Sequence, residues 1–243
     1  MPFTPAHAIA ALPFRRTRVD LTAMVVGSLS PDFEYFLRLA PHGGFGHTWL
    51  GGLVADLPLS LLVLWLYQSY LKAGLYAVAP GLFPFRETER KAAPVARGLR
   101  QWAIVVASIL LGAATHIVWD SFTHKDSWPY DHIAFLRAHV PLVFWRADMC
   151  NVLQVASSVA GMVVLVVMWA RWVGAERRPG VPLVRRLGIV LAVIALLSAV
   201  LRAVAMTHLF GKLVLTIIGV VTFLATLLLL VGLAGAWRRW MQK

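Results

Sequence analysis

The sequence predicts an all-α membrane protein, a polytopic helical bundle with about five transmembrane helices behind an N-terminal helical module. Composition is the first observation behind this prediction: 59% of the 243 residues are hydrophobic, 14% are charged, and the mean hydropathy is +0.73. Soluble domains have about 45–50% apolar and about 25% charged residues. The second observation is the recurrence of apolar stretches long enough to cross a membrane, and the third is the gathering of basic residues between them.

The N-terminal module covers residues 1–50. Its start, from Met1 to His7, lacks a basic segment followed by an apolar core, so we expect no signal peptide. The apolar stretch Leu21–Leu29 is too short to cross a membrane and is expected to pack on the bundle or to lie at the interface. Gly43, Gly44 and Gly46 indicate a flexible loop before the first span.

Residues 51–243 are expected to form a single membrane domain. A crossing needs roughly 20 apolar residues, and we find no internal repeat. The predicted spans are Gly52–Leu71, Trp102–Phe122, Val152–Val173, Leu187–Met206 and Leu213–Trp237.

The formal charge of +12 does not indicate a nucleic-acid-binding protein, because the basic residues cluster in loops between apolar stretches. By the positive-inside rule, the basic loops 73–101 and 174–186 face the cytoplasm, whereas the balanced loop 123–151 faces outward. The N-terminal module then also lies outside. Four arginines in that module oppose this orientation, because basic residues resist translocation: Arg15, Arg16, Arg18 and Arg38.

This topology gathers all eight histidines on one membrane face. The most informative group ends the second span, where His116, Asp120 and His124 are four residues apart and share a helical face. Such groups are costly at a membrane helix unless they pair, meet water or bind an ion. The single cysteine, Cys150, excludes an internal disulfide and a thiolate cluster. Any metal would therefore have nitrogen and oxygen ligands, which suit zinc, manganese or iron.

The N-terminal module offers further candidates. His7, Asp32 and His47 complete a plausible ligand set, and Pro31 would fix the Asp32 carboxylate at a turn. Glu34 could be a second ligand or a general base acting on a metal-bound water.

Four segments, in this order, resemble a bacterial membrane family of unknown function (the domain-of-unknown-function 4184 type): Thr4-Pro5-Ala6-His7, Ser30-Pro31-Asp32-Phe33-Glu34, Gly46-His47-Thr48 and Thr115-His116-Ile117-Val118-Trp119-Asp120. That family is itself similar to inner-membrane metal-dependent hydrolases distantly related to zinc-dependent phospholipase C. The resemblance covers the first 125 residues well and the last three spans weakly.

The resemblance implies a bacterial inner-membrane location and metal ligation by His7, Asp32, His47, His116 and Asp120. His124 lies beyond the motif. It also implies hydrolysis of a phosphoester or a related bond by a metal-activated hydroxide, with zinc the favoured ion. Glu34 departs from the hydrolases, which usually have a second Asp there, and this puts a second metal in doubt.

The interfacial depth of the site favours a membrane lipid or lipid-linked substrate. Candidate substrate contacts are Arg38, Lys125, Gln154 and Lys212. Two other functions stay open. The cluster could be a structural metal or a hydrogen-bonded staple in a non-catalytic membrane protein, since polar pairs hold helix bundles together. A transporter is the third choice, because no pair of broken half-helices occurs in matching positions. His42, His132 and His139 are expected to be interfacial loop residues.

Overall fold

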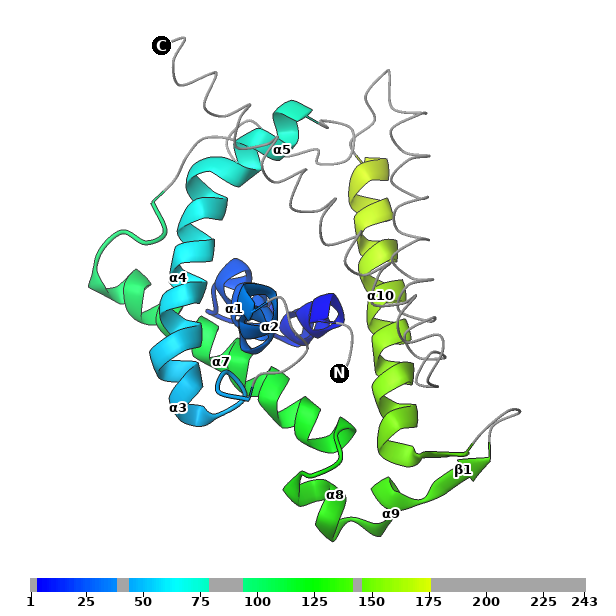
Figure 1. Ribbon diagram of the computed structural model, residues 1–243. Helices are drawn as coiled ribbons and strands as arrows, with labels where there is room; N and C mark the ends of the chain where they lie inside the picture. Colours follow the sequence, from blue (N-terminus) through cyan, green and yellow to red (C-terminus); the bar gives the residue numbers. More distant parts are fainter. Residues whose placement is uncertain (1–3, 39–43, 79–93, 142–145, 176–243) are drawn as a thin grey trace. The chain divides into compact units, whose positions relative to one another are not determined.

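The computed structural model describes residues 4–38, 44–78, 94–141 and 146–175. These residues are mostly helical, with one small two-stranded sheet (Figure 1). The chain divides into two compact units. The first comprises Met1–Leu64 with Val95–Met162, and the second comprises Trp65–Pro94 with Val163–Lys243.

The first unit begins with short helices. They are the 3-10 helix η1 (Thr4–Phe14), α1 (Leu21–Leu29), the 3-10 turn η2 (Ser30–Asp32) and α2 (Phe33–Arg38). Asp20 caps α1, because its side chain accepts a hydrogen bond of 2.9 Å from the Ala23 N–H. The helix ends just before Pro31, which cannot continue an α-helical hydrogen-bond ladder.

A nearly continuous helix follows the loop that carries His47. Its segments are α3 (Trp49–Gly51), the π-helical η3 (Gly52–Asp56), α4 (Leu57–Leu66), the π-helical η4 (Tyr67–Leu71) and α5 (Lys72–Val78). In the second unit, η4 and α5 pack locally, with the Lys72 ammonium 5.5 Å from the centre of the Tyr67 ring.

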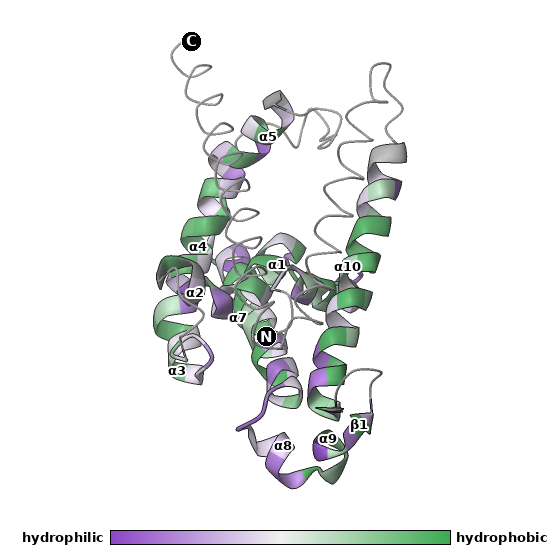
Figure 2. Cartoon of the chain, turned by 45° about the vertical axis from the view of Figure 1, so that its right-hand side comes forward, coloured by the Kyte–Doolittle hydropathy of each residue, from purple (hydrophilic) through white to green (hydrophobic). Residues whose placement is uncertain are grey.

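Two long helices and a polar connection complete the described chain. In order, the elements are α7 (Leu99–Thr123), α8 (Trp128–His132), α9 (Ala134–Arg137), β1 (His139–Pro141), β2 (Arg146–Asp148) and α10 (Met149–Ala175). The strands are antiparallel, and His139 lies opposite Asp148. Figure 2 shows apolar residues along most of α4, α7 and α10, whereas α8 carries more polar residues.

Three helical stretches are long and apolar enough to cross a membrane: Trp49–Tyr76, Leu99–His132 and Met149–Trp172. They correspond to the first three predicted spans, so the prediction of a helical membrane protein is confirmed at this level. The predicted spans Leu187–Met206 and Leu213–Trp237 lie outside the described residues.

Close packing of α1 on α7 positions the polar residues of the first unit. A Cβ on Gly27 would lie 2.1 Å from the Ile109 carbonyl oxygen, and one on Gly112 would lie 2.2 Å from the Met24 carbonyl oxygen. The helices therefore approach at glycines, as membrane helices commonly do. Beside this contact lies the apolar core, whose buried members are Ala23, Val26, Leu64, Val105 and Ile109.

Candidate metal centre

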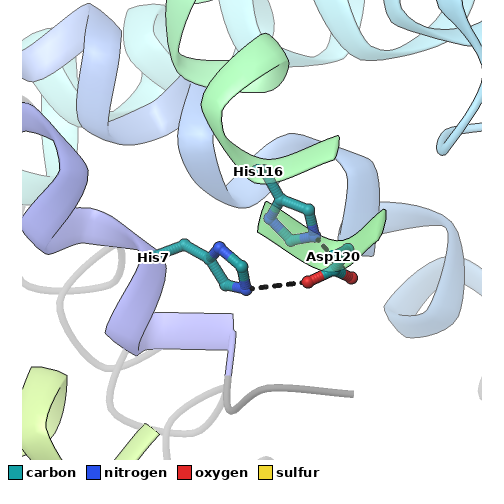
Figure 3. A group of neighbouring side chains, drawn as sticks. All are labelled: His7, His116 and Asp120. Carbon is teal, nitrogen blue, oxygen red and sulfur yellow. Dashed lines mark ion pairs between the residues drawn. The ribbon is translucent and has the colours of Figure 1, made fainter. Parts of the chain in front are cut away.

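Five of the six predicted ligands meet inside the first unit. His7 comes from η1, Asp32 from η2, His47 from the loop before α3, and His116 and Asp120 from adjacent turns of α7. Their donor atoms form two groups, each within 4.8 Å: His7 with His116 and Asp120, and Asp32 with His47 and His116. Figure 3 shows the first group, in which both imidazoles point toward the Asp120 carboxylate.

The distances between these donor atoms suit a metal ion better than direct hydrogen bonds. His116 Nε2 lies 3.4 Å from Asp120 Oδ2 and 3.6 Å from Asp32 Oδ1. His47 Nε2 lies 3.5 Å from each of the same two oxygens, and His7 Nε2 lies 3.4 Å from Asp120 Oδ1. Charge-assisted hydrogen bonds are about 2.7–2.9 Å long. Tetrahedral ligands at 2.0–2.2 Å from an ion lie about 3.3–3.6 Å apart.

All of these donor atoms except Asp120 Oδ2 are buried without hydrogen-bond partners. Among the described residues, eight buried side-chain nitrogen or oxygen atoms have no partner, and five of them belong to this cluster. Those five are Nε2 of His7, His47 and His116, and Oδ1 of Asp32 and Asp120. Burying polar atoms without partners is costly. A bound cation would give the donor atoms of either group a partner, so this donor set fits a divalent metal.

A backbone carbonyl orients His116. Its Nδ1 lies 2.8 Å from the Ser28 carbonyl oxygen, to which it donates, so Nε2 carries the lone pair that a metal needs. The Ser28 carbonyl belongs to the last turn of α1, where helical carbonyls have no partner within the helix. The residue three positions later is Pro31, which has no N–H to offer.

Two hydroxyl groups hold other ligands. Thr4 Oγ1 donates to Asp32 Oδ2 over 2.5 Å, and the Tyr35 hydroxyl lies 3.4 Å from His47 Nδ1. Neither residue was predicted from the sequence to belong to the site. A signal was present, since Thr4 stands three residues before His7, and Tyr35 stands three residues after Asp32. The role of the Ser28 carbonyl had no side-chain signal at all.

The imidazoles differ in their affinity for protons. The His7 ring stacks on His116, with centroids 3.8 Å apart. Burial, followed by the proximity of His116, lowers the pKa of His7 to about 4, so this ring is neutral at pH 7. Burial alone would also lower the pKa of His47, but the Asp120 and Asp32 carboxylates outweigh it and raise that pKa to about 9. A metal ion bound at neutral pH would displace the His47 proton.

The other predicted site residues lie elsewhere. His124 Nδ1 donates to the Asp120 backbone carbonyl at 2.8 Å and lies 3.8 Å from Asp120 Oδ2, outside both ligand groups. The Glu34 carboxylate accepts a 3.1 Å hydrogen bond from the Gly46 N–H, which anchors the loop before His47. Gln154 is buried near the start of α10. Arg38 ends α2, and Lys212 lies outside the described residues.

A second polar cluster surrounds Asp148, at the end of β2. Lys125 Nζ lies 2.7 Å from Asp148 Oδ2, and the Tyr130 hydroxyl donates to the same oxygen over 2.8 Å. His139 Nδ1 lies 2.7 Å from Asp148 Oδ1. Lys125, Tyr130 and His139 together lower the pKa of Asp148 to about 2. Lys125 therefore holds a carboxylate of its own chain.

Comparison with known proteins gives a family and no named relative. No curated protein and no solved structure matches the chain. The family model described as "Domain of unknown function (DUF4184)" matches residues 1–235, nearly the whole chain. The chain therefore belongs to the DUF4184 family.

Proposed function

We propose that the protein is a membrane-embedded, metal-dependent hydrolase that acts on a phosphoester or lipid-linked substrate at the membrane interface. The observation that carries this proposal is the convergence of three histidines and two aspartates at nitrogen–oxygen distances of 3.4–3.6 Å, with five buried donor atoms that lack hydrogen-bond partners. These distances exceed those of direct charge-assisted hydrogen bonds and match the separation of ligands around a shared ion, which supports the proposal.

All five clustered residues would supply donor atoms to the ion. His47, His116, Asp32 and Asp120 supply four donors, and His7 supplies a fifth next to Asp120 Oδ1. Because Nδ1 of His116 is engaged with Ser28, its Nε2 can serve one ion, and this favours a single ion shared by both ligand groups. Zinc is our first choice. When bound, a divalent ion supplies a Lewis acid that activates water and stabilises negative charge on a phosphoryl oxygen.

The net reaction adds water across one P–O ester bond. The water oxygen forms a bond to phosphorus, the ester P–O bond breaks, and a proton passes to the departing alkoxide. Glu34 remains a candidate base for the water proton, but its hydrogen bond to Gly46 supports a positioning role as well. Arg38, Lys125, Gln154 and Lys212 remain candidates for contacts with the substrate.

We further propose a bacterial inner-membrane protein with the site near the outer face. This orientation rests on the basic loops 73–101 and 174–186, which the positive-inside rule assigns to the cytoplasm. The four N-terminal arginines oppose it, and reporter fusions to the loop at 123–127 would decide between the two orientations.

One observation favours a second candidate, a non-catalytic protein with a structural metal. His7, Asp32, His116 and Asp120 are each at most 7% exposed, as in a closed structural site. His47 is the exception, because its side chain is 20% exposed and could admit water to the centre.

A hydrolysis assay separates the two candidates. The full chain is purified in detergent, stripped with chelator and reloaded with zinc or manganese, and alcohol release is measured from phosphomonoesters, phosphodiesters and phospholipids. We expect metal-dependent release that falls by more than about 100-fold in Asp120→Asn, a near-isosteric ligand change. His139→Ala, a matched change outside the centre, should retain activity. Stoichiometric metal without release from any substrate would support the structural candidate instead.

A further inference from the structure

A pocket of about 540 Å³ lies beside the metal centre, and one of its walls contains His7. All of its described lining residues belong to the first unit, and three elements provide them. The helix η1 contributes Ala6, His7, Ile9 and Ala10, α7 contributes Trp119, and α10 contributes Ala160. Pockets of this size are typical of ligand sites.

The polar groups in the pocket wall already have partners within the protein. Thr115 Oγ1 donates to the Gly112 carbonyl at 2.7 Å. Trp119 Nε1 donates to Ser157 Oγ at 3.2 Å, and that hydroxyl donates to the Gln154 carbonyl at 3.1 Å. The lining therefore presents mainly hydrocarbon, and His7 is its link to the metal centre. Such a wall suits an apolar ligand with a reactive group at one end.

The position of the pocket between two candidate membrane-spanning helices points to a lipid as the ligand. Two of its walls belong to α7 and α10, both of which are long and apolar enough to cross a membrane. Trp119 is 40% exposed and Ala160 is also exposed, so the pocket is partly open to the medium around these helices. In a bilayer that medium is lipid, and lipid chains are its abundant apolar component.

We infer that this pocket binds an acyl chain of a membrane phospholipid and that the chain directs the lipid's phosphoester toward the metal centre at His7. The inference rests on the proposed function and names its substrate class, a glycerophospholipid such as phosphatidic acid. Ala160 and Ala10 are then specificity-determining positions, because their small side chains leave space for the hydrocarbon.

Photo-crosslinking tests the pocket directly. The full chain is placed in phosphatidylcholine nanodiscs that contain phosphatidic acid with a diazirine at the end of one acyl chain, and labelled residues are mapped by mass spectrometry. We expect enriched labelling of Ile9, Ala10 and Ala160. Ala160→Trp should fill the pocket and lower labelling of η1 by about tenfold. The matched variant Val164→Trp, at a 38% exposed position one helical turn along α10, should leave it unchanged.

Uniform labelling of the pocket residues and Val164, or crosslinks from these residues to a second protein copy, would overturn the inference. A hydrolysis arm keeps its failure separate from that of the proposed function. Ala160→Trp should lose turnover of phosphatidic acid while retaining its metal and its turnover of a soluble phosphate ester. Pocket labelling without any hydrolysis would remove the proposed function and leave the lipid site. If Ala160→Trp leaves hydrolysis unchanged and the pocket is not labelled, the lipid site is removed and the proposed function stands.

Discussion

The first unit holds two clusters of histidine and aspartate, and they differ in the spacing of nitrogen and oxygen. Around Asp120 and Asp32, the nitrogens of His7, His47 and His116 lie 3.4–3.6 Å from the carboxylate oxygens, and both histidines and aspartates have atoms without hydrogen-bond partners. Around Asp148 the distances are 2.7–2.8 Å, and both carboxylate oxygens have partners. Similar residue types therefore form a cluster with unpartnered donor atoms around Asp120 and a fully hydrogen-bonded network around Asp148.

Backbone architecture produces this difference. In the centre, the ligands come from η1, η2, the loop before α3, and α7, and hydrogen bonds from behind hold His116 and Asp32 in place. In the Asp148 cluster, His139 faces Asp148 directly across the antiparallel pair β1–β2, so the two side chains meet without an intervening group. Partner distance, more than residue type, therefore distinguishes the candidate metal centre from the Asp148 network.

The largest expected effect is on metal content. His116→Ala removes the donor common to both ligand groups, so bound zinc should fall to background in elemental analysis of purified protein. His139→Ala changes the other cluster and should leave zinc content unchanged. If the two variants lose metal equally, the distinction between the clusters fails.

His116 is fully buried, so His116→Ala could lose metal simply because the protein misfolds. The response of the Tm to a chelator provides an independent test. Metal stabilises a folded protein that binds it, so chelator should lower the Tm of the wild type and of His139→Ala. Asp120→Asn preserves side-chain volume and should give a folded protein whose Tm does not respond to chelator. A chelator-sensitive Asp120→Asn would argue against Asp120 as a ligand.

Local sequence patterns predicted part of this centre, but not how its separate segments come together. The pair His116 and Asp120 follows from i, i+4 spacing on a helix, and the first three spans follow from apolar length. Convergence of His7, Asp32 and His47 on that pair came from a resemblance, because no local pattern sets the distance between separate helices. Direct pattern reasoning favoured His124 as much as His116, yet the ring of His124 caps the end of α7.

Two features were beyond sequence reasoning for physical reasons. The Ser28 carbonyl acts through the backbone, so its role depends on where α1 ends and how closely Gly27 and Gly112 allow α1 and α7 to approach. The pairing of Lys125, a predicted substrate contact, with Asp148 is set by the path of the chain through α8, α9 and the hairpin. Long-range pairing of this kind has no periodic signature.

Smaller effects should follow from removing the hydroxyl group that donates a hydrogen bond to Asp32 or to Asp148. Thr4→Val deletes the donor to Asp32 Oδ2 and should weaken zinc binding by about 10–100-fold, the usual consequence of losing a group that orients a ligand. Tyr130→Phe deletes the donor to Asp148 Oδ2 and should lower the free energy of unfolding by about 0.5–1.5 kcal/mol. Competition with a fluorescent zinc chelator measures the first quantity and denaturant unfolding measures the second. Weakened zinc binding in Tyr130→Phe would show that the clusters are coupled.

The smallest effect concerns acid stability of the Asp148 network. Its partners lower the pKa of Asp148 from an ordinary 3.8 to about 2, so the folded state gains stability from this group above pH 3.8 and loses it as the pH falls toward 2. Lys125 and His139 are 51% and 69% exposed, so solvent screening limits the gain to about 1 kcal/mol or less. Asp148→Asn should therefore lower the Tm slightly at pH 5, and its difference from the wild type should shrink between pH 4 and pH 2. Because both proteins share every other carboxylate, that difference isolates Asp148. A difference that stays constant with pH would mean that the Asp148 charge contributes nothing, and that the network holds the hairpin through neutral hydrogen bonds alone.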